Sequence, residues 1–76
     1  MTFELWDTES HNVVGEYESE LAALKVVKNA LKRRGRAFAT TIALVCEDDD
    51  GQSRTVAMGM QLATLAESAA IPAGPR

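Results

Sequence analysis

The sequence predicts an α+β domain in which two β-hairpins form an antiparallel sheet and one main helix packs on a face of that sheet. Two observations lead to this fold class. Apolar and polar residues alternate near the N-terminus and a β-branched, apolar run covers residues 40–46, whereas between these segments apolar residues recur at steps of three and four. Turn-forming residues separate the segments. We therefore expect the order ββαββα, in one domain over residues 1–70 followed by a flexible tail over residues 71–76.

The length of the chain limits its core. A chain of 76 residues buries only about 60% of the surface that its unfolded form exposes, so it is marginally stable alone. The composition is that of a globular domain, because 46% of the residues are apolar, 25% are charged and only two are proline. A second copy or another protein partner would add apolar burial at roughly 25 cal/mol per Å². A homo-oligomer, most simply a homodimer, is the expected state.

Residues 2–17 read as the first hairpin. Its apolar residues fall at even steps on one face of each strand: Phe3, Leu5, Val13 and Tyr17. Pairing Leu5 with Tyr17 makes Ser10-His11-Asn12 the loop and places Asn12 at its left-handed position, which Asn tolerates. Trp6 then falls on the other face, either half exposed or covered by something else. Trp6 is the candidate interface residue, because covering it with another copy would bury apolar surface.

The main helix is expected over residues 19–34. Ser19 is a suitable N-cap, and Gly35 suits the left-handed position that follows a helix. The residues expected to pack on the sheet are Leu21, Leu24, Val27 and Leu31. A second, shorter helix of lower apolar mass is expected from residue 59 to residue 70. Its apolar side is formed by Leu62, Leu65, Ala66 and Ala69.

The second hairpin joins residues 40–46 to residues 54–58 through the acidic run EDDDG. A two-residue Asp50-Gly51 turn would pair Leu44 with Ala57 and leave large side chains unmatched. A three-residue loop of residues 49–51 pairs Leu44 with Val56 instead, and also Ile42 with Met58, so we favour this register. It assigns Gly51 to the left-handed position of a bulged hairpin.

The acidic run also raises the question of a divalent-metal site. A helix-loop-helix calcium loop aligned on Gly51 would require oxygen ligands where this chain has Cys46 and Ala57, and it requires helices where strands are expected here. We therefore predict a solvated hairpin tip and no dedicated metal site. Weak, non-specific cation binding by the acids is the alternative.

Catalytic and cofactor motifs are not found in the sequence. His11 is the only histidine and lies in an expected loop, and Cys46, the only cysteine, alternates toward the sheet face as a buried small side chain would. There is no Walker loop or dinucleotide-binding glycine pattern. We expect neither an enzyme nor a bound cofactor. The lone cysteine and the lack of a leader or an 18-residue apolar run favour a cytoplasmic protein that does not insert into a membrane.

Charge is unevenly distributed although the net charge is only −3. The acids are concentrated in residues 1–20 and 47–67, whereas residues 21–46 contain six bases and no acid. The candidate contacts to phosphates or to an acidic partner are Lys25, Lys28, Lys32, Arg33, Arg34 and Arg36. The alternative is an ordinary solvated helix face. The acidic pI and the lack of aromatic residues among these bases weigh against nucleic acid as the partner.

The run ELWDTESHNVVGEYESELAALKVVKNALKRRG, followed by IALVCEDDDGQSR and a short Ala/Leu helix, resembles a group of short bacterial proteins of hairpin-helix-hairpin order. That group often has Ser-Gly-Asn at the first turn, where this chain has His11 in the middle. The group has no established activity, so the resemblance implies no functional residue. The ββαβ order is also similar in topology to the antidote proteins of small toxin-antitoxin pairs.

The function predicted from the sequence is a small, non-enzymatic protein-interaction module, expected to be a homodimer. The alternative is a nucleic-acid-binding or antitoxin-like regulator that uses the basic helix. These two hypotheses differ in the surface that they assign to the partner, which is the Trp6 side of the sheet in the first and the helix in the second.

Overall fold

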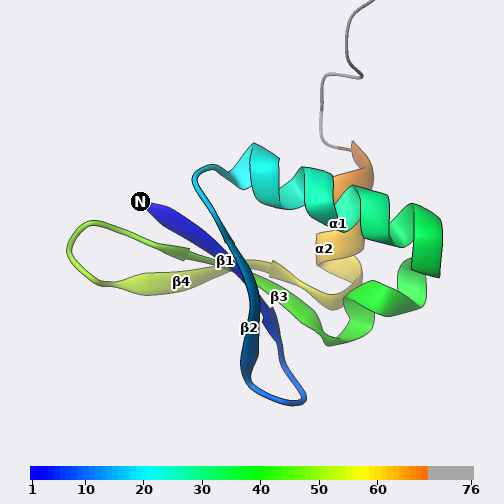
Figure 1. The fold of residues 1–76 in the computed structure, drawn as a ribbon, viewed down its shortest axis with the longest axis horizontal. Helices are drawn as coiled ribbons and strands as arrows, with labels where there is room; N and C mark the ends of the chain where they lie inside the picture. Colours follow the sequence, from blue (N-terminus) through cyan, green and yellow to red (C-terminus); the bar gives the residue numbers. More distant parts are fainter. Residues whose placement is uncertain (69–76) are drawn as a thin grey trace, which may run out of the picture.

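The computed structural model describes residues 1–68, within which four antiparallel strands form one sheet in the order β2-β1-β3-β4 (Figure 1). The elements are β1 (Thr2–Asp7), β2 (Asn12–Tyr17), α1 (Glu20–Arg34), the 3-10 helix η1 (Arg36–Thr41), β3 (Ile42–Glu47), β4 (Ser53–Met58) and α2 (Gly59–Ser68). The predicted α+β class and the ββαββα order are confirmed. The predictions for Ala69 and for the tail lie outside the described residues.

The core lies between the helices and one face of the sheet. Helix α1 contacts β1 and β2, α2 contacts β3 and β4, and the two helices contact each other. The sheet contributes Leu5, Ile42, Leu44 and Ala57 to the core cluster. The side of the sheet that carries these residues is called the covered face. Leu5 and Leu44 oppose each other on the two central strands and are 1% and 0% exposed. The other side of the sheet, which includes Trp6, is called the open face.

The ends of α1 are those that the sequence predicts. The Ser19 hydroxyl accepts a hydrogen bond from the Ala22 amide at 3.1 Å, which satisfies one of the free amides of the first turn. Gly35 follows the last turn with φ +82° and donates its amide to the Leu31 carbonyl at 2.8 Å. A positive φ favours glycine at this position, so the sequence signals at both ends of the helix are explained.

The prediction that Leu21 packs in the core is wrong. The buried residues of α1 are Ala23, Leu24, Val27 and Leu31, whereas Leu21 is 43% exposed. At about 100° per residue, Leu21 lies about 60° from Leu24 on the side away from Val27. The first turn therefore directs Leu21 to the margin of the core, and Ala23 is the first buried residue of α1.

The predicted register of the first hairpin is also wrong. Phe3 pairs with Tyr17 and Leu5 pairs with Gly15, and the ladder then shifts by one residue so that Trp6 pairs with Val13. The loop is Thr8–His11, stabilised by the His11 amide donating to the Asp7 carbonyl at 2.8 Å. His11, not Asn12, has the positive φ, at 59°. The pairing differs from the predicted one by two residues from the start of β1, and the bulge at Val14 shifts the ladder by one residue more, so that the turn lies closer to the N-terminus than predicted.

The second hairpin has the predicted loop but only part of the predicted register. The Asp48 amide donates to the Gln52 carbonyl at 2.8 Å, and Gly51 has φ +84°, so residues 49–51 form the loop with Gly51 in the left-handed region. Farther from the loop the ladder shifts between Leu44 and Val45. Leu44 therefore pairs with Ala57 and not with Val56, because a bulge at Val56 takes up one residue of β4.

Candidate functional site

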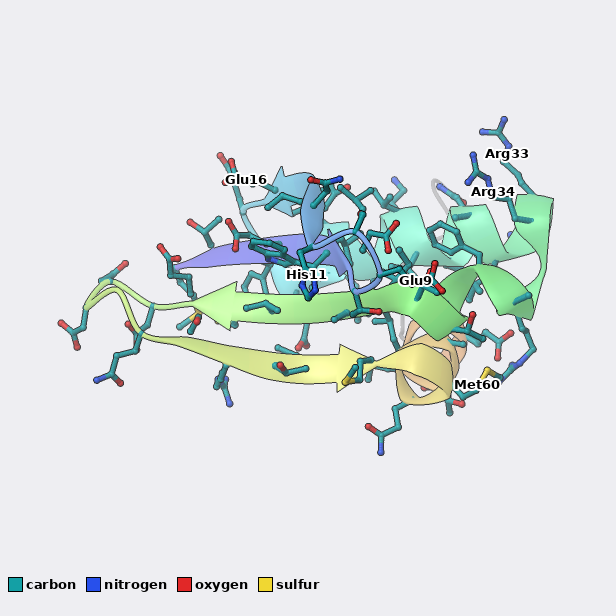
Figure 2. The ribbon with its side chains drawn as sticks, turned by 90° about the horizontal axis from the view of Figure 1, so that it is seen from below. Glu9, His11, Glu16, Arg33, Arg34 and Met60 are labelled. Carbon is teal, nitrogen blue, oxygen red and sulfur yellow. The ribbon has the colours of Figure 1, made fainter. Side chains whose placement is uncertain are left out.

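The open face carries an apolar row that runs from one edge of the sheet to the other. Trp6 pairs with Val13 on β2 and with Ala43 on β3, and Ala43 pairs in turn with Met58 on β4. Directly opposed residues of antiparallel strands share one face. Val13, Trp6, Ala43 and Met58, named here the apolar row, therefore form a continuous line of side chains. Figure 2 views the molecule from the side opposite α1.

Exposure within the apolar row is greatest at its two ends. Val13 is 43% exposed and Met58 is 49% exposed, whereas Trp6 is half-buried and Ala43 is 5% exposed. The centre of the row is thus shielded by its own larger neighbours. Both helices pack on the covered face, so the apolar surface at each edge of the open face is left to solvent.

Trp6 is held in place by a carboxylate of its own strand. The indole Nε1 donates a hydrogen bond to Glu4 Oε1 at 3.1 Å, which satisfies the polar atom of the ring while its apolar body stays accessible. Beside it lies a shallow hollow of about 310 Å³. The hollow is lined by Glu4, Trp6, Val45, Glu47, Ser53, Arg54 and Thr55. An oriented indole at the margin of a hollow is suited to bind a partner surface.

Three glutamates of the open face lie on the same side of the apolar row. Glu4 pairs directly with Glu16, and Glu47 follows Val45 by two residues on β3, so all three glutamates share the open face with Trp6. Like charges directly opposite each other on a sheet repel. Moving along a strand, the open face thus changes from the apolar row to a region that contains the three glutamates.

The sequence-based prediction missed Val13 and Met58 as residues of this surface. It placed both on the face that carries Leu5 and Leu44. Each edge strand contains a one-residue bulge, at Val14 in β2 and at Val56 in β4, and a shift of one residue turns the side chains beyond it to the opposite face. Neither the consecutive valines at positions 13 and 14 nor the stretch Thr55-Val56-Ala57 contains a signal that identifies the bulged residue.

The basic residues of α1 form a separate candidate surface on the helical layer. Lys25, Lys28 and Lys32 fall on one strip of the helix, beside its buried face, as predicted. Lys28 and Lys32 line a hollow of about 380 Å³ together with Leu31 and Glu67. Within residues 1–68, none of the three lysines forms an ion pair. Their charges are therefore available to an anionic partner.

The arginines after this strip are not all part of the same surface. Arg36 is paired with Glu67 of α2, and the Arg34 guanidinium lies 5.7 Å from the centre of the Phe38 ring, within cation–π range. Arg33 is exposed at the C-terminal end of α1, near Arg34 (Figure 2). The fold thus separates the six predicted contacts into a lysine strip, an exposed Arg33 and two arginines with intramolecular partners.

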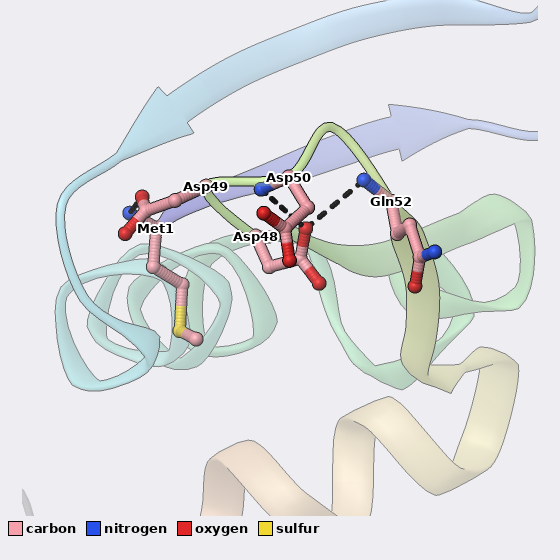
Figure 3. A network of polar contacts seen from close by, with 5 residues as sticks. All are labelled: Met1, Asp48, Asp49, Asp50 and Gln52. Atoms are coloured by element: carbon pink, nitrogen blue, oxygen red, sulfur yellow. Dashed lines mark hydrogen bonds and ion pairs between the residues drawn. The ribbon is translucent and has the colours of Figure 1, made fainter.

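The acidic hairpin tip is organised by its own backbone (Figure 3). One Asp48 carboxylate oxygen accepts hydrogen bonds from the amides of Asp50 and Gln52, both at 3.0 Å. Asp49 accepts from the N-terminal amine of Met1 at 2.8 Å, and this pair is exposed. The hydrogen bond and the attraction lower the pKa of Asp49 and raise the pKa of the amine. The acids therefore contribute to the loop itself.

The single histidine and the single cysteine lie in different parts of the fold. His11 is exposed in the loop of the first hairpin (Figure 2), and Cys46 is a buried free thiol, 2% exposed. Among residues 1–68, no three His, Cys, Asp or Glu side chains are grouped closely enough to hold a metal ion. In the same part of the chain, no helix is long and apolar enough to cross a membrane.

Comparison with known proteins gives no relative from which a function could be transferred. No family model, no curated protein and no solved structure matches the chain. The open face and the lysine strip are therefore assessed by their own chemistry.

Proposed function

We propose that the protein is a small, non-enzymatic interaction module that acts as a homodimer in the cytoplasm, with the open face as its interface. The apolar row carries this proposal, because it leaves Val13 and Met58 about half exposed on a face that neither helix covers. Exposed apolar side chains gathered beside a half-buried Trp are typical of binding surfaces. The free thiol of Cys46 is consistent with a reducing compartment.

The edges of the sheet favour this face over strand-to-strand pairing. In residues 1–68 the edge strands are β2 and β4, and each contains a bulge, opposite Leu5/Trp6 and Leu44/Val45 respectively. Bulges interrupt the regular row of amides and carbonyls that a second chain would need for edge pairing. A partner therefore gains more by covering the open face than by extending the sheet.

The absence of enzymatic activity is supported by the surroundings of the ionisable groups. No polar or charged side chain of residues 1–68 is buried. General acid–base catalysis relies on carboxylates or imidazoles whose pKa is moved by burial or by a close charged partner. The close charged pair that moves a pKa here, Met1 and Asp49, is exposed at the hairpin tip.

The dimer is tested by sedimentation with a matched pair of methionine variants. Met58 lies on the open face and is 49% exposed, whereas Met60 lies on α2 (Figure 2) and is 47% exposed. Met58→Lys should raise the dissociation constant at least about tenfold, which corresponds to 1.4 kcal/mol. Met60→Lys should leave it unchanged. A wild-type monomer at tens of micromolar, or equal effects of the two variants, would refute the proposal.

A second candidate function is binding to nucleic acid through the lysine strip. The specific observation in its favour is that Lys25, Lys28 and Lys32 share one strip and lack ion-pair partners within residues 1–68. Binding through phosphate contacts weakens with salt. On duplex DNA, the logarithm of the association constant falls by about 0.9 for each phosphate neutralised when the salt concentration rises tenfold. A gel shift with random DNA and RNA at low salt tests this function. Lys28→Glu combined with Lys32→Glu should abolish the shift, and a wild-type protein that gives no shift would exclude it.

A further inference from the structure

The helical layer carries a second surface, on which the proposed homodimer does not depend. We infer that the lysine strip of α1 binds an acidic amphipathic helix of a partner protein. In this complex the carboxylates of the partner contact the three lysines, and its apolar side chains cover Leu21. The inference goes beyond the proposed dimer, whose interface is the open face, and it competes with nucleic acid for the same strip.

The lysine strip is a run of like charge with no compensation on its own helix. Lys28 follows Lys25 by three residues and precedes Lys32 by four, so their ammonium groups are neighbours on the helix surface. Like charges at these spacings destabilise a helix. Residues 21–46 contain no acid, and the acid of α1, Glu20, lies in the first turn. The strip is therefore satisfied best by carboxylates that come from outside this helix.

The neighbouring helix α2 does not supply these carboxylates. Glu67 lines the hollow of about 380 Å³ beside Lys28 and Lys32, but its carboxylate is paired with Arg36. The other ion pair within residues 1–68, between the Met1 amine and Asp49, lies at the hairpin tip. An acidic side chain that enters the hollow thus meets two ammonium groups that have no ion-pair partner in this part of the chain.

An exposed leucine stands in line with the lysines. At about 100° per residue, Leu21 lies within about 40° of each lysine around the axis of α1, and it is 43% exposed. From residue 21 to residue 32 the strip is about 17 Å long, which matches about three turns of a second helix. An amphipathic helix presents carboxylates and apolar side chains at steps of three and four on one face. Such a helix fits both the charges and the leucine of this strip.

The same features favour an acidic peptide over nucleic acid. A phosphate backbone has no apolar group that covers Leu21. Helix α1 contains no aromatic residue on which a base could stack, and Phe38, which follows it, is half-buried against Arg34. The net charge of −3 repels a long polyanion more than it repels a short acidic segment.

The inference is tested by fluorescence anisotropy with a labelled synthetic peptide. The probe is a helix of about 18 residues built from Glu, Leu and Ala, with Glu and Leu at helical spacing on one face. A scrambled peptide of the same composition is the control. At about 50 mM salt, the wild type should bind the helical peptide at least about tenfold more tightly than the scrambled one. Equal binding of the two peptides, or no binding of the helical peptide, would overturn the inference.

Two matched pairs of variants at exposed positions of α1 locate the bound peptide. Lys25→Glu and Arg33→Glu change the net charge equally, but Arg33 lies about 80° or more from the lysines around the helix axis. Lys25→Glu should weaken binding at least about tenfold, and Arg33→Glu by less than about threefold. Leu21→Ala should weaken binding by about threefold or more. Val26→Ala, at a residue 40% exposed and about 140° from Leu21, should leave it unchanged. Equal effects within either pair would refute the inference.

The outcomes separate this inference from the functions proposed above. Binding of random DNA or RNA without binding of the helical peptide would assign the strip to nucleic acid and refute the inference. If Lys25→Glu dissociates the dimer in sedimentation, acids of a second copy occupy the strip, and the inference is wrong in that case too. A wild-type monomer that binds the helical peptide with the expected dependence on Lys25 and Leu21 would refute the homodimer and support the inference.

Discussion

The two faces of the sheet differ although their residues alternate along the same strands. Leu5 and Leu44 on the covered face are 1% and 0% exposed, whereas their neighbours Trp6 and Val45 on the open face are half-buried. The covered face is packed by α1 and α2, whereas the open face combines the apolar row and Val45 with three glutamates. The first face thus provides stability, while the second keeps apolar surface that a partner can bury.

This difference allows substitutions on the two faces to separate effects on folding from effects on the proposed association. Changes on the covered face alter the free energy of unfolding, because its side chains have no freedom to relax. Changes on the open face alter association more than folding, because its side chains already contact water. The predictions below compare the two faces, or the elements that set them, in order of expected effect.

The largest effect is expected from truncation in the covered face. Leu44→Ala removes a side chain that is fully buried and should lower the free energy of unfolding by about 2–5 kcal/mol, through lost burial and a residual cavity. Val45→Ala, one residue away on the open face, should cost about 1 kcal/mol or less. Urea denaturation at low protein concentration measures both. Equal costs would show that the two faces are not energetically distinct.

The next largest effect is expected at Gly51, the left-handed residue of the loop between β3 and β4, the strand that contains Met58. Gly51→Val forces a β-branched residue into φ +84° and should destabilise the fold by about 1–3 kcal/mol. Asp50→Ala in the same loop should change stability by less than about 0.5 kcal/mol. Thermal unfolding distinguishes them. A larger loss for Asp50→Ala would indicate that the acidic side chains, and not the backbone conformation, hold the loop.

A smaller effect is expected at the cap of the helix that covers the sheet. Ser19→Ala removes the hydroxyl that accepts from the Ala22 amide at 3.1 Å and should cost about 1 kcal/mol. Ser10→Ala, an exposed residue of the first hairpin loop, is the matched control and should be nearly neutral. The dissociation constant of the proposed dimer should be unchanged by both variants, since neither residue lies on the open face.

The smallest effect is the pH dependence of the exposed pair at the hairpin tip. The hydrogen bond to the amine lowers the pKa of Asp49 from its ordinary value of 3.8, and the bond to Asp49 raises the pKa of the amine from 8.0. The stabilisation is therefore fully present between these two ordinary values. It is lost at lower pH as Asp49 protonates through its lowered pKa, and at higher pH as the amine deprotonates through its raised pKa.

Comparing the melting temperatures of the wild type and Asp49→Asn across pH measures this contribution. The difference should be greatest near about pH 6 and should shrink in acid, in base and at high salt, because the pair is exposed and screened. A difference that persists unchanged in acid would assign it to a cause other than the ion pair.

Local signals in the sequence were sufficient for much of the fold. The N-cap Ser19, the following Gly35 and the apolar steps between them identify α1 within a residue at each end, because these interactions lie within the helix itself. The same holds for Gly51, whose position after Asp50 indicates a left-handed turn residue. The lysine strip also follows from helical spacing alone.

The candidate interface could be predicted only in part. Alternation placed Trp6 on the face opposite Leu5, which the pairing confirms. It could not place Val13 or Met58, because the regular alternation on which it relies is broken once in each edge strand. Nor could it separate Arg34 and Arg36 from the lysines, since their partners Phe38 and Glu67 come from other elements.

The sequence by itself determined the element order, the ends of α1 and the loop at Gly51, because each depends on interactions between residues close in the chain. The tertiary structure decided which side chains form the open face. An edge strand must both bury side chains under the helices and pair with its neighbouring strand. Where regular alternation cannot meet both requirements, a bulge forms, and the residues that set these requirements are distant in the chain. The two bulges turned Val13 and Met58 outward into one row with Trp6, and thereby created the surface on which the proposed function depends.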